Sequence, residues 1–181
     1  MEIKVIRSHK RRRTVSARVV NDILVVSAPV LIPQPHLEKI VANFKERFER
    51  KKLKEELNKK EGLESVAQRL NERYFENKLS IDTIEYVTNH KSKFGCCNYR
   101  SRHIRISHRI STMPAWVRDY VIIHELAHLL EPNHSKAFWD FVNRYELAER
   151  AKGYLMAVGL GQEDDSGNEN EGEVIYKGRD T

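Results

Sequence analysis

The chain has 181 residues, of which 40% are hydrophobic and 32% are charged, and its net charge is +6. This composition suits one hydrophobic core of ordinary size, with extensions at the termini. It excludes a membrane-spanning protein, because no apolar run is long enough, and the basic residues 1–13 are not followed by the apolar stretch of a signal peptide. We therefore expect a cytoplasmic protein without a membrane partner.

The N-terminal residues 1–35 form a basic region with the pattern of a β-hairpin. Strands are predicted at Val15–Val20 and Ile23–Ala28, because β-branched residues dominate both runs. The pair Asn21-Asp22 between them favours a tight turn. The sequence therefore predicts two strands that lie side by side and run in opposite directions.

Two helices are predicted next. Apolar residues recur at helical spacing over residues 36–60, and Gly62 ends this helix. A second helix is predicted over residues 63–75 by the same spacing. Strands at Thr83–Val87 and His103–Ser107 then flank a predicted loop.

A metal-binding motif follows, since His124, Glu125 and His128 form the pattern H-E-x-x-H within a mostly apolar helix. Residues four apart lie on the same face of a helix, so two imidazoles can bind one tetrahedral Zn²⁺ ion. Glu125 lies next to the first ligand and can reach a metal-bound water without binding the metal. This is the arrangement of a general base in metallopeptidases.

The third ligand is predicted to be His134. Pro132 cannot continue the helix, so the chain must turn between His128 and His134, and the turn brings His134 back over the open side of the site. Glu131 occupies the position where the metzincin pattern requires glycine, which excludes that class. A carboxylate from the next helix is the alternative third ligand. The candidates are Glu146 and Glu149.

The segment 93–139 resembles the YgjP-like metallopeptidase family, a zincin-like group related in its site to the SprT-like and WLM proteases. The family pattern reads W-G-S-C, a strand, H-E-L-A-H and N-H-S-x-x-F-W. The matching residues here are Phe94-Gly95-Cys96-Cys97, the strand His103–Ser107, His124–His128, Asn133-His134-Ser135 and Phe138-Trp139. The resemblance extends over most of residues 4–160, including a basic N-terminal strand. It implies zinc bound by His124, His128 and His134, with Glu125 as the base.

Phe94 and Cys96 depart from the family pattern, which has tryptophan and serine there. A substrate contact made by the predicted loop 94–101 is therefore expected to differ in this chain. Cys96 and Cys97 are adjacent, so they are poor partners for a structural disulfide and fit a reducing compartment. Packing in the core or loop is the favoured role for both, over metal binding or reactivity.

The strand His103–Ser107 is the predicted substrate-binding element. Edge strands of zincins hold an extended substrate by strand addition, and this strand is the candidate for that position. Its residues alternate, with Ile104 and Ile106 on one face and three polar side chains on the other. The substrate-binding residues predicted in this way are His103, Arg105 and Ser107.

The charge is uneven along the chain. Residues 161–181 contain seven acidic and two basic residues, a net charge of −5, so residues 1–160 carry +11. Basic residues concentrate at Lys10–Arg13 and at Lys91–Arg109, where they form either a solvated surface or a site for nucleic acid or another polyanion. The acidic tail is expected to be disordered, and its charge suggests weak self-inhibition by contact with the basic body.

These patterns predict an α+β, zincin-like fold, in which a small mixed or antiparallel sheet packs on the H-E-x-x-H helix with additional helices. Residues 36–160 are expected to form the metallopeptidase domain as one domain together with residues 1–35, followed by the acidic tail. The expected function is zinc-dependent hydrolysis of peptide bonds in a peptide or protein substrate. The alternatives are a phosphohydrolase acting on nucleotides and a nucleic-acid-associated module in which zinc is structural.

Overall fold

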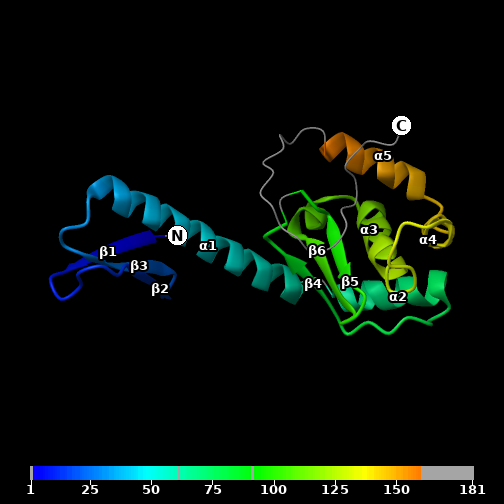
Figure 1. Cartoon of the computed structure of the whole chain (residues 1–181), viewed down its shortest axis with the longest axis horizontal. Coiled ribbons are helices and arrows are strands. Elements are labelled where there is room, and N and C mark those ends of the chain that lie inside the picture. Colours follow the sequence, from blue (N-terminus) through cyan, green and yellow to red (C-terminus); the bar gives the residue numbers. More distant parts are fainter. Residues whose placement is uncertain (1, 61, 91, 160–181) are drawn as a thin grey trace. The chain divides into compact units, whose positions relative to one another are not determined.

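The computed structural model describes residues 2–60, 62–90 and 92–159 (Figure 1). Contacts divide the chain into two compact units, one that extends to Leu53 and one that begins at Lys54. This division lies inside helix α1 (Gln34–Lys60), whereas the boundary predicted from the sequence lies at residue 35. That residues 1–35 and 36–160 behave as one domain stays a prediction. The predicted tail, residues 161–181, lies outside the described residues.

The N-terminal unit contains a three-stranded sheet in the order β1-β3-β2. Strands β2 (Ser16–Val20) and β3 (Ile23–Pro29) are antiparallel, which confirms the predicted hairpin. The turn residues Asn21 and Asp22 both have positive φ, 49° and 61°, as the tightest hairpin turns require. Strand β1 (Glu2–Ser8) was not predicted; it pairs with β3 in parallel, a contact between segments distant in sequence.

One face of this sheet forms the core of the N-terminal unit. Leu24, Val26 and Ala28 of β3 are fully buried. In the neighbouring strand β1, Ile3 pairs with Leu24 and Val5 pairs with Val26. Helix α1 faces these residues, because Ile3 and Val5 line a pocket of about 280 Å³ together with residues on its N-terminal half. Only one α1 residue, Leu37, is buried.

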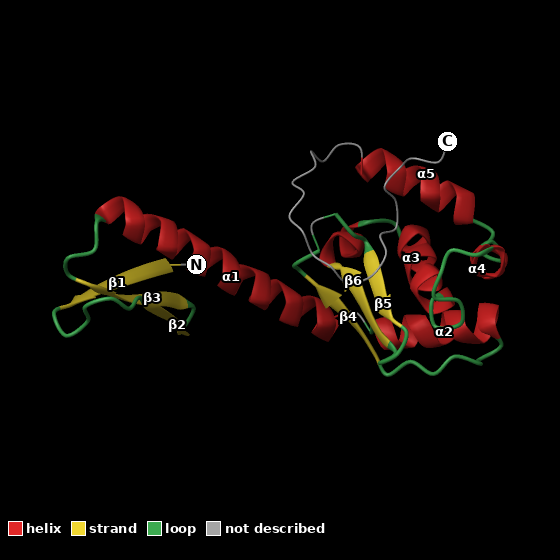
Figure 2. Ribbon diagram, in the orientation of Figure 1, coloured by secondary structure: helices red, strands yellow, loops and turns green. Residues whose placement is uncertain are grey.

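The second unit contains another three-stranded sheet, in the order β4-β6-β5 (Figure 2). Strand β4 (Thr83–Val87) is parallel to β6 (His103–Ser107), and β5 (Gly95–Asn98) is antiparallel to β6. Helix α2 (Leu63–Phe75) and strands β4 and β6 have the predicted bounds. The predicted loop 94–101 is wrong in part, because four of its residues form β5.

Helix α3 (Ala115–Ala127) packs against β5, β6 and α2. All its residues from Tyr120 to Ala127 are buried, and Ile104 and Ile106 of β6 belong to the same core. A 3₁₀ helix, η1 (His108–Thr112), precedes α3. Helices α4 (Lys136–Val142) and α5 (Ala148–Gly159) follow it. The predicted α+β class, with a small mixed sheet packed on the H-E-x-x-H helix, is confirmed.

No helix in the described part of the chain is long and apolar enough to cross a membrane. Helix α1 has the length, with 27 residues, but it is strongly charged. Pairs four residues apart join Lys45 to Glu49 and Glu46 to Arg50 along its surface, with N···O distances of 3.9 and 3.5 Å. Such exposed pairs each contribute only about 0.3–0.5 kcal/mol to a helix.

Candidate metal centre

Helix α3 carries His124, and His128 caps its C-terminus in helical conformation, so both lie on one face, as the four-residue spacing predicts. Both side chains are buried, with 1% and 7% exposure. The helix ends at Ala127, and the backbone then tightens into a turn in which the N–H of Leu130 donates to the carbonyl of Ala127. The predicted turn after the motif is therefore present.

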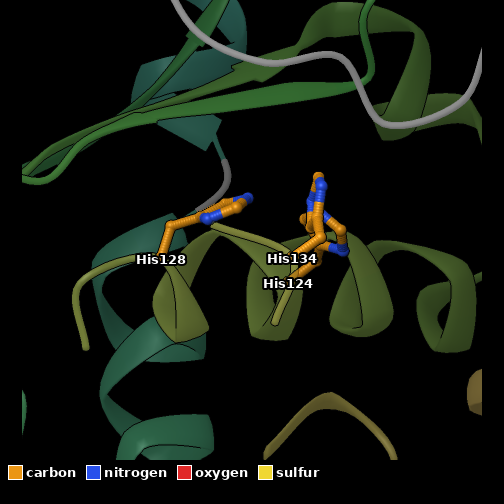
Figure 3. A group of neighbouring side chains, drawn as sticks. All are labelled: His124, His128 and His134. Carbon is orange, nitrogen blue, oxygen red and sulfur yellow. The ribbon is translucent and has the colours of Figure 1, made fainter. Parts of the chain in front are cut away.

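His134 lies after this turn, immediately before helix α4. Ser135 caps α4, because its hydroxyl oxygen accepts a hydrogen bond of 3.2 Å from the N–H of Phe138. The cap fixes the backbone beside His134 and directs its side chain toward α3. Figure 3 shows the rings of His124, His128 and His134 projecting into one space.

The three imidazoles fit a transition-metal ion. One nitrogen from each ring lies within 4.8 Å of the others, and the Nε2 atoms of His124 and His134 are 3.1 Å apart. Tetrahedral zinc with Zn–N bonds of about 2.0–2.1 Å separates its ligand nitrogens by about 3.3 Å. Burial holds the pKa of His124 well below its ordinary value, and the neighbouring His128 and His134 lower it further. That ring is therefore neutral, which is the form that binds metals.

A backbone carbonyl orients the second histidine. Nδ1 of His128 lies 3.2 Å from the carbonyl oxygen of Glu131. A carbonyl can only accept, so Nδ1 carries the proton and donates it, which leaves the Nε2 lone pair for the metal. The turn that ends α3 thus has a second role, since it supplies the acceptor that fixes the His128 tautomer.

Aromatic rings surround the three histidines. The Phe138 ring centroid lies 4.5–4.8 Å from the ring centroids of all three histidines. Trp139 stacks on His134 at 5.5 Å with an interplanar angle of 22°. Apolar rings exclude water from one side of the site and restrict the rotamers of the histidines.

Glu125 is buried, with 1% exposure, and neither carboxyl oxygen has a hydrogen-bond partner among the described residues. Burial raises the pKa of Glu125 to about 8, and Lys93 opposes this shift. A buried carboxyl without a partner is costly to a fold and is therefore a mark of functional sites.

Gly95 of β5 provides the space that Glu125 occupies. A Cβ atom built on Gly95 would lie 2.5 Å from Oε1 of Glu125 and 2.9 Å from its Cδ and Cγ. Side-chain atoms do not approach so closely, so a larger residue at this position would displace the carboxyl group. This role of Gly95 was not predicted, because the contact with Glu125 joins segments thirty residues apart and Gly95 stands out in the sequence only as part of the family pattern.

The predicted role of His103–Ser107 as an edge strand is wrong. Strand β6 is the central strand of its sheet, paired with β4 on one side and β5 on the other, so it has no free edge for a substrate. Ser107 is also fully buried. Strand addition to His103, Arg105 and Ser107 is therefore excluded, and the edge strand beside Glu125 is β5.

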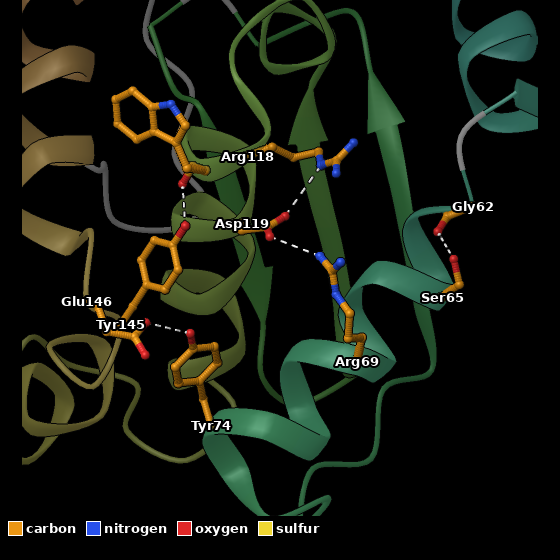
Figure 4. A network of polar contacts seen from close by, with 9 residues as sticks. Gly62, Ser65, Arg69, Tyr74, Arg118, Asp119, Tyr145 and Glu146 are labelled. Atoms are coloured by element: carbon orange, nitrogen blue, oxygen red, sulfur yellow. Dashed lines mark hydrogen bonds and ion pairs between the residues drawn. The ribbon is translucent and has the colours of Figure 1, made fainter.

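The alternative ligands Glu146 and Glu149 lie outside the histidine cluster. Glu146 accepts hydrogen bonds from the Tyr74 hydroxyl at 2.9 Å and from Arg73 at 3.0 Å. The Tyr74–Glu146 bond is part of a network in which Arg69 also pairs with Asp119 of α3 (Figure 4). Glu149 pairs with Lys152. Among the described residues, the group able to hold a metal consists of the three histidines.

The departures from the family pattern lie in the protein interior. Phe94 is 4% exposed, and the guanidinium of Arg109 lies 4.6 Å from its ring centroid. Cys96 and Cys97 are free thiols. Burial raises the pKa of both thiols, that of Cys97 to about 12. Neither cysteine is thus a thiolate near neutral pH, which supports the predicted packing role over a reactive one.

No curated protein matches the chain significantly. The crystal structure of the metallopeptidase zymogen of Pyrococcus abyssi abylysin is 19% identical, with a TM-score of 0.47, over 52% of this chain and 92% of that chain. The metallopeptidase zymogen of Methanocaldococcus jannaschii jannalysin is 17% identical, with a TM-score of 0.46, over 55% of this chain and 98% of that chain.

The match to a family model covers all of helix α1 and most of the second unit. The model described as "YgjP-like, metallopeptidase domain" matches residues 30–152. This range contains the three histidines, Glu125 and Gly95, and it confirms the resemblance seen in the sequence. The chain belongs to the YgjP-like metallopeptidase family.

Proposed function

We propose that the protein is a zinc-dependent peptidase, in which His124, His128 and His134 hold the metal and Glu125 is the general base. The observation that carries this proposal is the juxtaposition of three imidazole nitrogens with one buried, unpaired carboxyl group. A structural zinc site usually has four protein ligands, whereas three leave a position open for catalysis. This difference favours an enzyme over a nucleic-acid-associated module with structural zinc.

Zinc bound by these histidines would supply Lewis acidity, which lowers the pKa of water and polarises a carbonyl group. The residues of the chain supply the proton transfers. Glu125, as a carboxylate, would accept a proton from the attacking water and donate it to the leaving amine. Its burial beside Gly95 strengthens its basicity and holds the carboxyl group in one place.

A peptide substrate is favoured by the edge strand. Strand β5 pairs on one side with β6, and its first residue, Gly95, touches Glu125. An extended peptide that added to the other side of β5 would place its backbone carbonyls near the catalytic carboxyl group. A nucleotide would make no use of this edge. We therefore favour hydrolysis of peptide bonds over hydrolysis of phosphoanhydrides. A cytoplasmic location stays a prediction from the sequence.

The test compares purified wild type with Glu125→Gln on two substrates, an unstructured protein and a nucleoside triphosphate. The amide keeps the size of the side chain but cannot accept the proton. We expect proteolysis by the wild type, a loss of about 10²–10⁴-fold in Glu125→Gln, and the same zinc content in both proteins. Turnover of the triphosphate alone would replace the peptidase with a phosphohydrolase. Equal activity of the two proteins would exclude Glu125 as the base.

A further inference from the structure

The N-terminal unit carries most of the excess positive charge of residues 1–160. Residues up to Leu53 include thirteen basic and five acidic residues, a net charge of +8. Since the whole chain has a net charge of +6, the rest of the chain carries −2. The histidine cluster lies entirely in the other unit. Since residues 161–181 carry −5, residues 54–160 carry +3, so most of the positive charge of residues 1–160, +8 of +11, belongs to a part of the chain that the proposed catalysis does not explain.

Nine of the thirteen cations of this unit form two groups that differ in their partners. On α1, Lys45, Arg50 and Lys52 pair with acidic residues at 3.9, 3.5 and 3.2 Å, respectively. Of the seven cations that precede α1, Arg7 donates hydrogen bonds to the carbonyl of Val30 and to Oε1 of Gln34, and the other six have no ion pair with any described acidic residue. We call this group the basic face, and it consists of Lys4, Lys10, Arg11, Arg12, Arg13 and Arg18. Five of the six side chains are exposed, and Arg11 is half-buried.

The register of the strands places part of the basic face on one side of the sheet. Lys4 of β1 and Arg18 of β2 both pair with Val25 of the central strand, so the three residues form one row across the sheet. Successive side chains of a strand point to opposite faces. Since Leu24 and Val26 face the core, Val25 and its two cationic neighbours lie on the opposite side.

The remaining cations lie at one end of this sheet. Lys10–Arg13 connect β1 to β2, and this connection follows Ser8, which pairs with Pro29 at the end of β3. Four consecutive cations therefore lie at the edge of a face that already carries Lys4 and Arg18. Strands lie about 4.8 Å apart, so Lys4 and Arg18 stand about 10 Å from one another across the sheet.

We infer that the basic face binds nucleic acid through its phosphate backbone, a function beyond the proposed peptidase activity. Unpaired cations spread over a sheet and its adjoining loop complement a chain of phosphates. The rows on each side of Lys4–Val25–Arg18 contain Glu2, Ile6, Ser16, Val20, Ile23 and Ser27, with no aromatic side chain for base stacking. The binding is therefore independent of sequence. The connection Lys10–Arg13 also lacks the apolar side chains that insert into membranes.

The test measures the affinity of the full chain for labelled DNA of about 20 nucleotides, single-stranded and duplex, over a series of salt concentrations. Two triple variants remove the same charge from the same unit. One replaces Arg11, Arg12 and Arg13 with alanine, and the matched control replaces the paired residues Lys45, Arg50 and Lys52. The basic-face variant should bind at least about 10-fold more weakly at about 0.1 M salt, with a salt slope smaller by about 2. The control should change by less than about 3-fold.

A second variant, Lys4→Ala with Arg18→Ala, should weaken binding in the same direction. DNA of a scrambled sequence should bind equally well. Equal losses in the two triple variants would show that net charge alone attracts DNA and would overturn the inference. It would equally be overturned by the absence of binding at about 0.05 M salt, or by binding to vesicles of anionic phospholipid and not to DNA.

Discussion

The two sheets of this protein have the same topology but different surroundings. In each sheet, a central strand pairs in parallel with one neighbour and antiparallel with the other. The sheet of the second unit packs on α3, nine of whose thirteen residues are buried. The N-terminal sheet faces α1, which buries one residue of its 27. The strand arrangement alone therefore does not create the metal centre, which depends on the apolar helix packed against β5 and β6.

The difference in packing predicts a difference in sensitivity to mutation. Ile106 of β6 is fully buried, whereas Ile6 of β1 is 43% exposed. Ile106→Ala should lower the free energy of unfolding of its unit by about 2–5 kcal/mol, since it leaves a cavity in the core. Ile6→Ala should cost less than about 1 kcal/mol. Urea denaturation of both variants measures the two effects, and similar costs would contradict the comparison.

The contact between β5 and α3 predicts a role for Gly95 in positioning Glu125. Gly95→Ala should reduce kcat by about 100-fold, or roughly 3 kcal/mol, because the new Cβ displaces the carboxyl group. Zinc content and KM should change little. The shorter side chain of Glu125→Asp relieves the clash, so Gly95→Ala should cost much less in that background.

Gly153 of α5 provides the matched control for this substitution. A Cβ at Gly153 meets nothing within 4 Å, so Gly153→Ala should leave activity unchanged and stabilise α5 by about 0.5–1 kcal/mol. Full activity of Gly95→Ala would show that Glu125 does not need the space beside β5.

The burial of Glu125 predicts a pH-dependent stability of the metal-free protein. Its pKa rises from 4.5 in the unfolded chain to about 8 in the fold, so the folded state holds the proton more tightly. The contribution of Glu125 to the free energy of unfolding is fully present at pH values below its pKa in the unfolded chain. It is lost as the pH rises toward about 8, by at most about 1.4 kcal/mol per pH unit. Glu125→Gln should remove this loss. Denaturation of both metal-free proteins at about pH 5 and pH 8 tests it, and parallel pH profiles would contradict the shift.

Local patterns in the sequence predict the elements that short-range physics controls. The spacing of apolar residues predicted α2, β4 and β6 with their observed bounds. The H-E-x-x-H spacing and Pro132 predicted that His134 returns to the face of His124 and His128. In each case the determining interaction lies within one helix, one strand or one turn.

Pairings between distant segments could not be predicted in this way. Strand β1 pairs with β3, which begins fifteen residues after it ends. Strand β5 contains glycine and two cysteines, so it lacks the alternation that identifies a strand. Because β5 was missed, β6 was wrongly placed at an edge of its sheet, and the contact between Gly95 and Glu125 was not found. Each error follows from tertiary contacts that override local preference.

Zinc stoichiometry tests the central claim most directly. Wild type, His134→Ala and Glu146→Ala are purified without chelators, and their bound metal is measured by plasma mass spectrometry. The proposed site predicts about one zinc per chain in the wild type and in Glu146→Ala, and a large loss in His134→Ala. Zinc that is retained in His134→Ala but lost in Glu146→Ala, or a wild type that binds no metal when zinc is supplied, would contradict the three-histidine centre.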